Sequence, residues 1–265
     1  MSETSYISTT HSGHVATVVF NRPPHNFANP QVMRELLRTL EALDADNNCR
    51  CVVLTSEGKN FCAGVDFSGA VGEDSSSDTA NEDTGDIAAG LYATAMRLFT
   101  TRKPIVAAVQ GAAVGAGAGL ALVADFRVVT VDSRFAFNFN RLGFHPGFGI
   151  SLTLPRLVGV QKAAALMYTG RRLGGEEAVA MGLADELAPK DALLASAQAF
   201  AAGIAESAPL AVQSTRQTLR AGLAEAVREV NQRELAEQRL HFATEDFQEG
   251  VKAMTERRTP VFMGR

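Results

Sequence analysis

The sequence predicts an α/β core followed by a mostly helical C-terminal part. Apolar runs rich in Val, Ile and Ala predict strands at residues 15–20, 51–55, 105–109 and 126–131. Helical patterns separate these runs, and strands that alternate with helices favour crossover connections of the βα type. Beyond residue 159 helical patterns dominate, and such a tail has to pack on the core or on another subunit to be stable.

The first predicted helix has the clearest boundary. Asn29 is placed to cap it, and Pro30 fits its first turn, where the missing N–H would have no helical acceptor. Apolar side chains at helical spacing predict its buried face, and these are Met33, Leu36, Leu37, Leu40 and Leu43.

Further helices follow from the same periodicity, while one segment between them has none. The predicted helices span 87–99, 161–168, 175–181 (ended by Gly182), 191–205, 209–219 and 223–240. Residues 68–86 carry six acidic side chains and three consecutive serines but no basic residue. Because such a composition cannot bury enough apolar surface to order itself, it predicts a mobile loop.

Composition and charge exclude several classes of protein. The formal net charge is -4, whereas nucleic-acid binding requires a basic surface, so we expect no nucleic-acid partner. We expect no membrane association, because no apolar run approaches the ~20 residues of a membrane span. Three cysteines without CxxC spacing predict reduced thiols, no metal site and a cytoplasmic location.

Two glycine-containing turns are the segments most suggestive of chemistry. Residues 60–66 follow the second predicted strand, and residues 110–120 follow the third. The second turn lacks GxGxxG spacing, so a dinucleotide site is disfavoured. Each turn can be a plain tight turn or a close helix contact. Together, however, two backbone N–H groups at such turns form the arrangement that stabilises an oxyanion derived from a thioester.

Segments along the whole chain resemble the crotonase (enoyl-CoA hydratase/isomerase) family. They occur in family order at 21–23, 61–66, 103–111 with the following Gly/Ala loop, 142–147, 154–159, 169–171, 178–184, 247–250 and 258–262. The resemblance implies a crotonase-like ββα spiral core over 1–200 and a helical trimerisation region over 201–265. It also implies an acyl-CoA substrate, no cofactor beyond that coenzyme A, and a homotrimer or dimer of trimers.

The resemblance also assigns site residues. The family's two oxyanion-hole N–H groups fall on Val65 and Ala116. The remaining substrate-binding positions are His25, Asn26, Phe27, Ala63, Gly64, Asp66, Gly115, Phe139 and, from an adjacent subunit, Phe262.

The sequence departs from the family at the acid/base positions. The two glutamates of family hydratases fall on Gly119 and Phe139, which cannot transfer a proton. His145 is a candidate replacement, and its alternative is a structural histidine in a turn. If Phe139 lies on a strand and faces the pocket, alternation turns Asn138 and Asn140 away from it.

Other side chains near these positions have two readings. Asp66 is a candidate base or a structural residue at a helix start. Four phenylalanines predict either a bulky apolar pocket or ordinary core, and these are Phe137, Phe139, Phe144 and Phe148.

Three functions are compatible with this pattern. The first is an acyl-CoA enzyme of the enoyl-CoA hydratase/isomerase type with an atypical acid/base. The second is a different reaction on the same oxyanion hole, such as hydrolysis or carbon–carbon cleavage. The third is a protein that binds acyl-CoA without turning it over.

Overall fold

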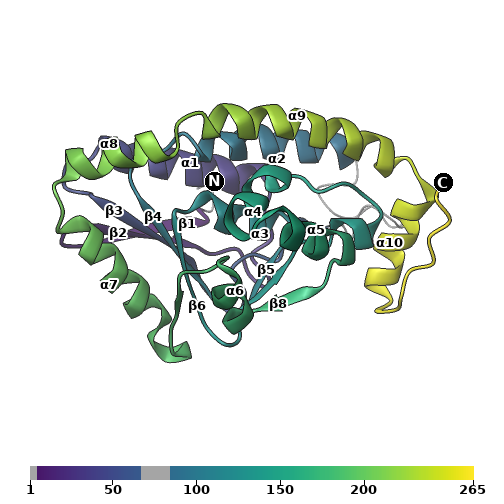
Figure 1. The fold of residues 1–265 in the computed structure, drawn as a ribbon, viewed down its shortest axis with the longest axis horizontal. Helices are drawn as coiled ribbons and strands as arrows, with labels where there is room; N and C mark the ends of the chain where they lie inside the picture. Colours follow the sequence, from purple (N-terminus) through teal and green to yellow (C-terminus); the bar gives the residue numbers. More distant parts are fainter. Residues whose placement is uncertain (1–4, 67–83) are drawn as a thin grey trace.

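Two β-sheets form the centre of the protein, whose computed structural model describes residues 5–66 and 84–265. The larger sheet has the strand order β1-β2-β3-β4-β6-β9 (Figure 1). Its strands are β1 (Ile7–Ser12), β2 (Val15–Phe20), β3 (Cys51–Ser56), β4 (Ile105–Val109), β6 (Phe126–Val129) and β9 (Glu186–Leu187). β1 and β2 pair antiparallel, and the other neighbours pair parallel.

The smaller sheet begins where the chain leaves β4. Its strands are β5 (Ala112–Val114), β7 (Arg134–Ala136) and β8 (Arg172–Gly174), in the order β5-β7-β8. β5 follows β4 after only two residues, so the chain passes directly from one sheet to the other at the second glycine turn.

Helices cover the sheets and form most of the C-terminal half. They are α1 (Pro30–Ala45), α2 (Thr84–Leu98), α3 (Ala116–Val123), α4 (Ile150–Val158), α5 (Val160–Thr169), α6 (Gly175–Met181), α7 (Leu193–Ala205), α8 (Pro209–Leu219), α9 (Leu223–Phe242) and α10 (Glu245–Thr255). Two short 3-10 helices, η1 (Phe139–Leu142) and η2 (Lys190–Ala192), complete the described elements.

Most predicted elements are confirmed. Asn29 caps α1, since its side chain accepts a hydrogen bond from the N–H of Val32, and all five residues of the predicted apolar stripe are buried. The bounds of α6 and α8 agree with the prediction, and the other predicted helices agree to within a few residues. β6 ends two residues earlier than expected, at Val129.

Some elements were not predicted, and the reason is physical. β1 is an edge strand whose residues are mostly exposed, so it lacks an apolar alternation. β5, β7, β8 and β9 are too short to carry a periodic signal. Most of the predicted mobile loop lies outside the described residues. For residues 84–86, the last part of that loop, the prediction was wrong, because α2 already begins at Thr84.

Each face of the larger sheet is covered by different helices (Figure 1). α7 lies on one face, where Ala197, Ala201 and Ala205 pack against β-strand residues such as Val53 and Val106. The small alanines at four-residue spacing let the helix approach the sheet closely. α1, α2 and α3 contribute to the main core on the other side. Residue 200, the boundary expected between the two parts of the chain, therefore falls inside α7.

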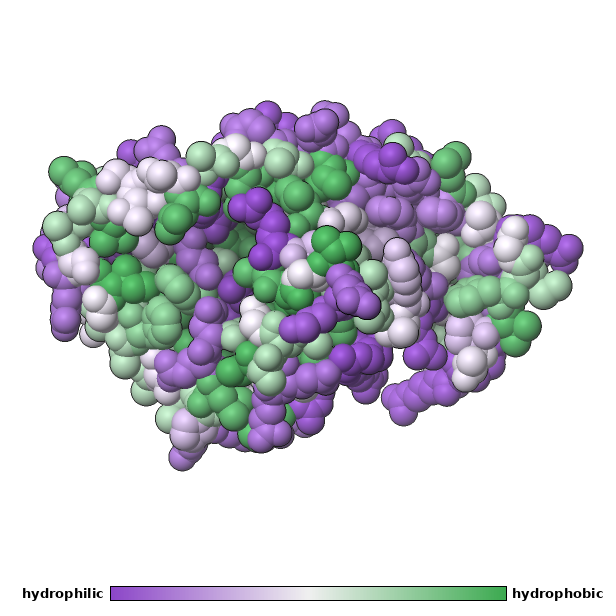
Figure 2. All heavy atoms as spheres, viewed as in Figure 1, coloured by the Kyte–Doolittle hydropathy of each residue, from purple (hydrophilic) through white to green (hydrophobic). Residues whose placement is uncertain are grey.

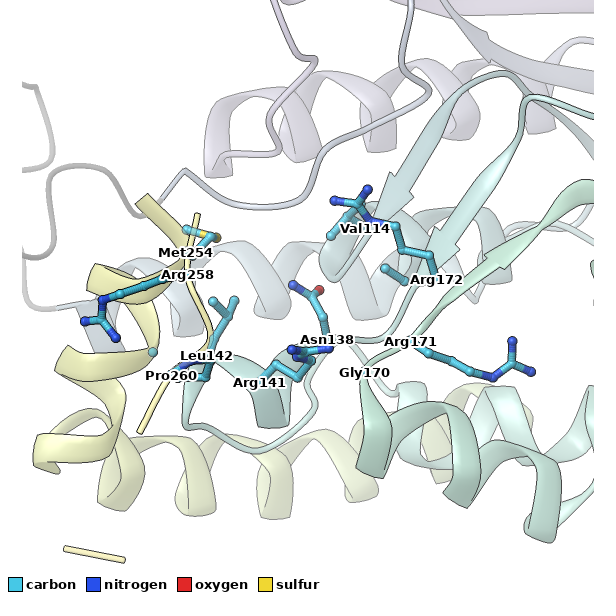
Figure 3. A pocket seen from close by; sticks show the side chains of 12 residues that line it. Val114, Asn138, Arg141, Leu142, Gly170, Arg171, Arg172, Met254, Arg258 and Pro260 are labelled. Carbon is cyan, nitrogen blue, oxygen red and sulfur yellow. The ribbon is translucent and has the colours of Figure 1, made fainter. Parts of the chain in front are cut away.

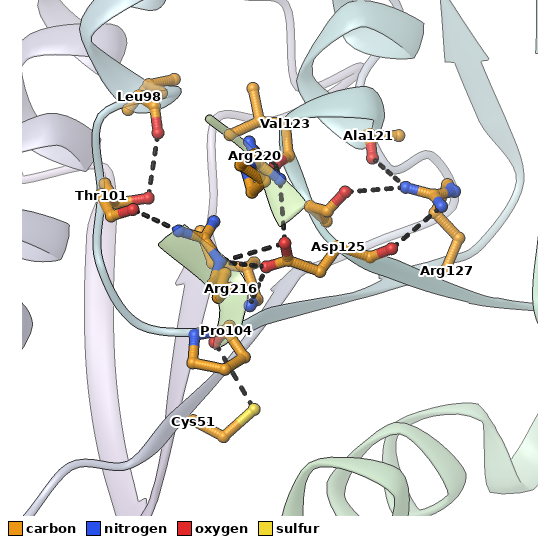
Figure 4. A network of polar contacts seen from close by, with 12 residues as sticks. Cys51, Leu98, Thr101, Pro104, Ala121, Val123, Asp125, Arg127, Arg216 and Arg220 are labelled. Carbon is orange, nitrogen blue, oxygen red and sulfur yellow. Dashed lines mark hydrogen bonds and ion pairs between the residues drawn. The ribbon is translucent and has the colours of Figure 1, made fainter. Parts of the chain in front are cut away.

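Asp125 ties the C-terminal helices to the core (Figure 4). Its carboxylate accepts hydrogen bonds from Arg216 at 2.8 Å and Arg220 at 2.9 Å, both on or next to α8. It also accepts from the N–H of Ile105 at 2.9 Å, at the start of β4. Arg216 in turn donates to the carbonyl of Thr101. One carboxylate thus connects α8 to the central sheet.

A third arginine is fully enclosed beside this carboxylate. Arg127 is 2% exposed, and burial lowers its pKa from the ordinary value. Its guanidinium donates to the carbonyls of Leu183 at 2.6 Å and Ala124 at 2.9 Å. Because it satisfies these carbonyls, the end of α3 and the segment before β9 stay together.

Replacing Asp125 by Asn should destabilise the protein. Asn keeps one acceptor but leaves Arg216 and Arg220 without a counter-charge, and breaking a largely buried ion pair costs about 3 kcal/mol. We expect the free energy of unfolding to fall by that amount in chemical denaturation. Asp132→Asn is the matched control, since Asp132 pairs with Lys190 on the exposed surface and should change little. Equal losses in both variants would contradict the role given to Asp125.

Candidate active site

The two glycine turns lie side by side because their backbones pair. Cys62 and Ala113 form an isolated parallel bridge. The N–H of Cys62 donates to the carbonyl of Ala112, and the N–H of Val114 donates to the carbonyl of Cys62, both at 3.0 Å. The residues after β3 therefore continue the parallel pairing alongside β5, and this brings residues 63–66 next to the start of α3.

Glycine is required at two points of this contact. Gly64 has φ 93°, and an added Cβ would lie 2.7 Å from the carbonyl oxygen of Val114. An added Cβ on Gly117 would overlap the carbonyl of Cys62. Both positions would force the two turns apart if they carried a side chain.

Val65 and Ala116 lie at one small cavity, and each has a backbone N–H without an acceptor among the described residues. Ala116 is the first residue of α3, so its N–H has no acceptor within the helix. In the described parts of the chain, neither N–H donates a hydrogen bond to the protein. Both residues line a cavity of about 60 Å³. Residues 63–66 are irregular, and the residues after them lie outside the described range.

The other side chains that line the cavity are mostly apolar or aromatic. Phe139 and Phe144 form an edge-to-face pair with ring centroids 5.4 Å apart, and Leu142 and Met254 add aliphatic surface. Among the described residues that line the cavity, Tyr92 carries the one ionisable side chain. Burial raises the pKa of Tyr92 well above its usual range, so its hydroxyl stays protonated and can donate but not accept a proton as a base.

An aromatic ring occupies the space beside Gly119. An added Cβ on Gly119 would lie 2.6 Å from the ring of Phe148, which is fully buried. Phe148 adopts φ 65°, and its ring contacts that of Tyr92 edge to face at 5.9 Å. The family resemblance places glutamates at positions 119 and 139. Here position 139 is itself a phenylalanine, and the ring of Phe148 fills the space next to Gly119.

The structure brings together six of the site residues expected from the sequence. These cavity-lining residues are Ala63, Gly64, Val65, Gly115, Ala116 and Phe139.

The other expected binding residues do not line the cavity. His25 lies behind it, where its carbonyl accepts from the N–H of Ala63 at 3.2 Å. Asn26 is buried, and its amide donates to the carbonyls of Glu57 and Asn60, which indicates a structural turn residue. Phe27 packs edge to face on His25, Asp66 is exposed, and Phe262 is 39% exposed in the C-terminal tail.

His145 lies outside the residues that line the cavity. Its Nδ1 is 2.7 Å from the carbonyl oxygen of Pro146, and its ring stacks parallel to His241 with centroids 6.5 Å apart. Its own carbonyl accepts from Gln238. This placement favours the alternative in which His145 is a structural residue of the turn.

Asn138 is a correction to the sequence analysis. It was expected to point away from the pocket because strand alternation was assumed for residues 138–140. Residues Phe139–Leu142 instead form the 3-10 helix η1, and Asn138 lines the cavity together with Phe139. Of the four phenylalanines, Phe139 and Phe144 line the cavity, whereas Phe137 and Phe148 are buried in the core.

A wider groove of about 550 Å³ adjoins the cavity (Figure 3). The two share Val114, Asn138, Leu142 and Met254. Four arginines line the groove, and these are Arg141, Arg171, Arg172 and Arg258. Sequence reasoning missed this basic groove and Tyr92, because the residues come from separate elements and form no local motif.

Glu234 holds the loop that carries Phe148. This α9 carboxylate is fully buried and accepts hydrogen bonds from the N–H groups of Gly149 at 2.7 Å and Ser151 at 3.0 Å, at the start of α4. Burial raises its pKa from 4.5 to about 7, although the two hydrogen bonds act in the opposite direction. A pKa above the unfolded value means that the native state binds the proton more tightly. The tighter proton binding stabilises the native state. This contribution to the free energy of unfolding is fully present below pH 4.5 and is lost as the pH rises to about 7.

Replacing Glu234 by Gln should remove this pH dependence. Relative to the wild type, the free energy of unfolding of Glu234→Gln should rise by about 3 kcal/mol between pH 4.5 and 7.5 and stay constant above that. Denaturant titrations at stepped pH measure this difference. Glu229→Gln, on the exposed surface of the same helix, is the control and should follow the wild type. A constant difference between Glu234→Gln and wild type would contradict the assignment.

Comparison with known proteins assigns the class. The family model described as enoyl-CoA hydratase/isomerase matches residues 10–265, so the chain belongs to that family. A putative enoyl-CoA hydratase of Thermus thermophilus is 36% identical over 255 residues, covering 94% of this chain and 98% of the relative. The 1,2-epoxyphenylacetyl-CoA isomerase of Escherichia coli is 30% identical over 95% of each chain.

Solved structures agree with this assignment. An enoyl-CoA hydratase/isomerase from Pseudoalteromonas atlantica superposes with a TM-score of 0.85 at 28% identity, over 98% of this chain and 100% of that one. The predicted crotonase-like fold with a helical C-terminal region is thereby confirmed. In the parts of the chain that the structure describes, there is no cluster of side chains able to hold a metal ion, and no helix is long and apolar enough to cross a membrane.

Proposed function

We propose that this enzyme binds an acyl-CoA thioester with its carbonyl oxygen between the N–H groups of Val65 and Ala116. The observation that carries the proposal is that both residues line the same cavity and that neither backbone N–H has an acceptor within the described residues. The N–H of Ala116 lies at the start of α3, where the positive end of the helix dipole favours a carbonyl oxygen that gains negative charge. The N–H of Val65, from an irregular segment, adds a second backbone donor.

The surroundings strengthen this polarisation. The lining side chains are mostly apolar, so two hydrogen bonds to the thioester oxygen would act in a medium of low dielectric constant. The donors are held by the Cys62 backbone pairing and need not reorganise when charge develops on the oxygen. An enolate or a tetrahedral adduct of the thioester would be stabilised more than the uncharged ester.

The acid/base of the proposed enzyme is atypical. Gly119 and Phe139 carry no ionisable group, and the protonated Tyr92 hydroxyl is the one acidic group among the described lining residues. His145 is retained as a candidate because its loop also contributes Phe144 to the cavity wall. Its carbonyl contact with Pro146 would have to be released for it to act.

Removing one N–H tests the proposed oxyanion hole. Ala116→Pro deletes the N–H at the first position of α3, where proline is compatible with a helix. With a cinnamoyl-CoA probe, the wild type should shift the absorbance of the conjugated thioester to longer wavelength, and Ala116→Pro should abolish most of that shift. Turnover of any substrate should fall by about 100-fold or more.

Ala116→Gly is the matched control, because it alters the same residue and keeps the N–H. It should retain the spectral shift. A folded Ala116→Pro protein with an unchanged shift would remove Ala116 from the oxyanion hole.

A second function has a specific observation in its favour. The space next to Gly119 is filled by Phe148, which leaves no room there for a carboxylate or the water that it would activate. This disfavours addition of a water held at position 119 to the acyl chain. It supports a reaction that does not use that water, such as isomerisation, carbon–carbon cleavage or hydrolysis by a water that attacks the thioester carbonyl from elsewhere, or acyl-CoA binding without turnover. One of the relatives is itself named as an isomerase.

Crotonyl-CoA distinguishes these functions. We expect the protein to bind it, seen as a raised melting temperature, and to leave the conjugated-enoyl absorbance almost unchanged, because no carboxylate is in place to activate water. Rapid loss of absorbance would establish hydration. In that case, loss of hydration in the His145→Ala variant would identify His145 as the base, and hydration at the wild-type rate would exclude it.

We propose that copies of the chain assemble as a trimer or a dimer of trimers in the cytoplasm. Large apolar side chains are exposed on the helices (Figure 2), among them Val160 at 75% and Tyr168 at 74% on α5 and Leu210 at 80% and Leu219 at 75% on α8. Contact between copies would cover such side chains. The three buried free thiols suit a reducing location.

A further inference from the structure

The groove beside the cavity continues the proposed thioester site. Val114, Asn138, Leu142 and Met254 line both spaces, so a ligand whose carbonyl lies at Val65 and Ala116 can extend from one into the other. The cavity of about 60 Å³ is too small for most of an acyl-CoA molecule, whereas the groove of about 550 Å³ has room for a further part of it.

Two of the four groove arginines are already neutralised. Arg171 pairs with Glu177 at 2.6 Å, and Arg258 pairs with Glu249 and Glu256. Arg141 and Arg172 differ, because neither has a carboxylate partner in the described parts of the chain. The groove lining described here contains no acidic side chain. A protein with net charge -4 thus keeps two uncompensated guanidinium groups beside its candidate site.

The local structure directs both side chains to the groove. The aliphatic stem of Arg141 crosses Gly170, where an added Cβ would lie 2.7 Å from its Cγ, so the absence of a side chain at 170 gives the stem its place. Arg172 lies in β8 opposite Ala136 of β7, which is itself a lining residue. Figure 3 shows the Arg172 guanidinium turned toward Val114 and that of Arg171 pointing away.

We propose that Arg141 and Arg172 form an anion subsite that binds a negatively charged oxygen group of the acyl-CoA. Guanidinium groups suit this task, because their N–H donors match the paired oxygens of a carboxylate or phosphate. The group has two possible sources on the same molecule: a carboxylate at the far end of the acyl chain, or a phosphate of coenzyme A. The inference rests on the proposed function, which places the thioester carbonyl at Val65 and Ala116.

Matched thioesters separate the two sources. Hexanoyl-CoA and adipoyl-CoA have the same chain length, and only the second ends in a carboxylate. Hexanoyl-pantetheine lacks the phosphates of coenzyme A that remain in the other two. Binding of all three is measured by calorimetry to the wild type, to the double variant Arg141→Gln/Arg172→Gln, and to the control Arg171→Gln, whose charge is already paired with Glu177.

A carboxylate subsite predicts that the double variant loses about tenfold or more in affinity for adipoyl-CoA and less than twofold for hexanoyl-CoA. A phosphate subsite predicts a similar loss for both CoA esters and none for hexanoyl-pantetheine. Either result supports the subsite and identifies its ligand, provided that Arg171→Gln stays within twofold of the wild type.

Three results would overturn the inference. One is that the double variant binds every thioester with the same affinity as the wild type. That result would contradict the anion subsite but leave the proposed function intact. Another is an equal loss for hexanoyl-pantetheine, or a changed oligomeric state in size-exclusion chromatography, either of which assigns the arginines a structural role. The third is a wild type that binds no thioester, which would overturn the proposed function as well.

Discussion

The pairing of Cys62 with Ala113 is the contact on which the candidate site depends. β3 and β4 are neighbouring parallel strands, so their carboxyl ends lie at the same end of the larger sheet, and the segment after each strand leaves the sheet there. Without a further connection, the segments after these strands would be free to separate. Two backbone hydrogen bonds at Cys62 keep them parallel for one more step, and that step places Val65 beside the first turn of α3. Gly64 and Gly117 permit the contact, because a side chain on either would clash with the opposite backbone.

The cavity is lined by backbone segments of the two glycine turns and by mostly apolar side chains. Behind the aromatic side chains is a buried polar layer from α9, in which Gln238 binds the carbonyl of His145 and Glu234 caps α4. These groups are used to hold the loop in place. The function proposed above therefore depends more on where backbone atoms are fixed than on which ionisable side chains are present.

Much of this arrangement was predictable from the sequence. The strands that lead into the two turns are apolar runs, and the cap and stripe of α1 are local signals, so both are readable without tertiary information. The two N–H donors followed from the family resemblance, and the structure places both residues at one cavity.

The features that the sequence analysis misplaced or missed depend on tertiary structure. Asn138 was misplaced because strand alternation was assumed around Phe139, where the chain forms η1. The fit of Phe148 against Gly119, the Tyr92 hydroxyl and the arginine groove all arise from residues that are distant in the chain. Their relation is fixed by packing, and no spacing within a single segment encodes it. Strands of two or three residues were missed for the related reason that tertiary pairing, not composition, creates them.

The contact between Phe148 and Gly119 also constrains the order in which these two positions can be substituted during evolution. A carboxylate at position 119 requires that the ring leave first, since the two cannot coexist. Loss of a fully buried phenylalanine leaves a void that typically costs about 3–5 kcal/mol, a large share of the stability of a protein. The intermediate sequence would therefore be disfavoured even if both ends of the path were well folded. Packing thus couples the choice of residue at position 119 to the choice of residue at position 148.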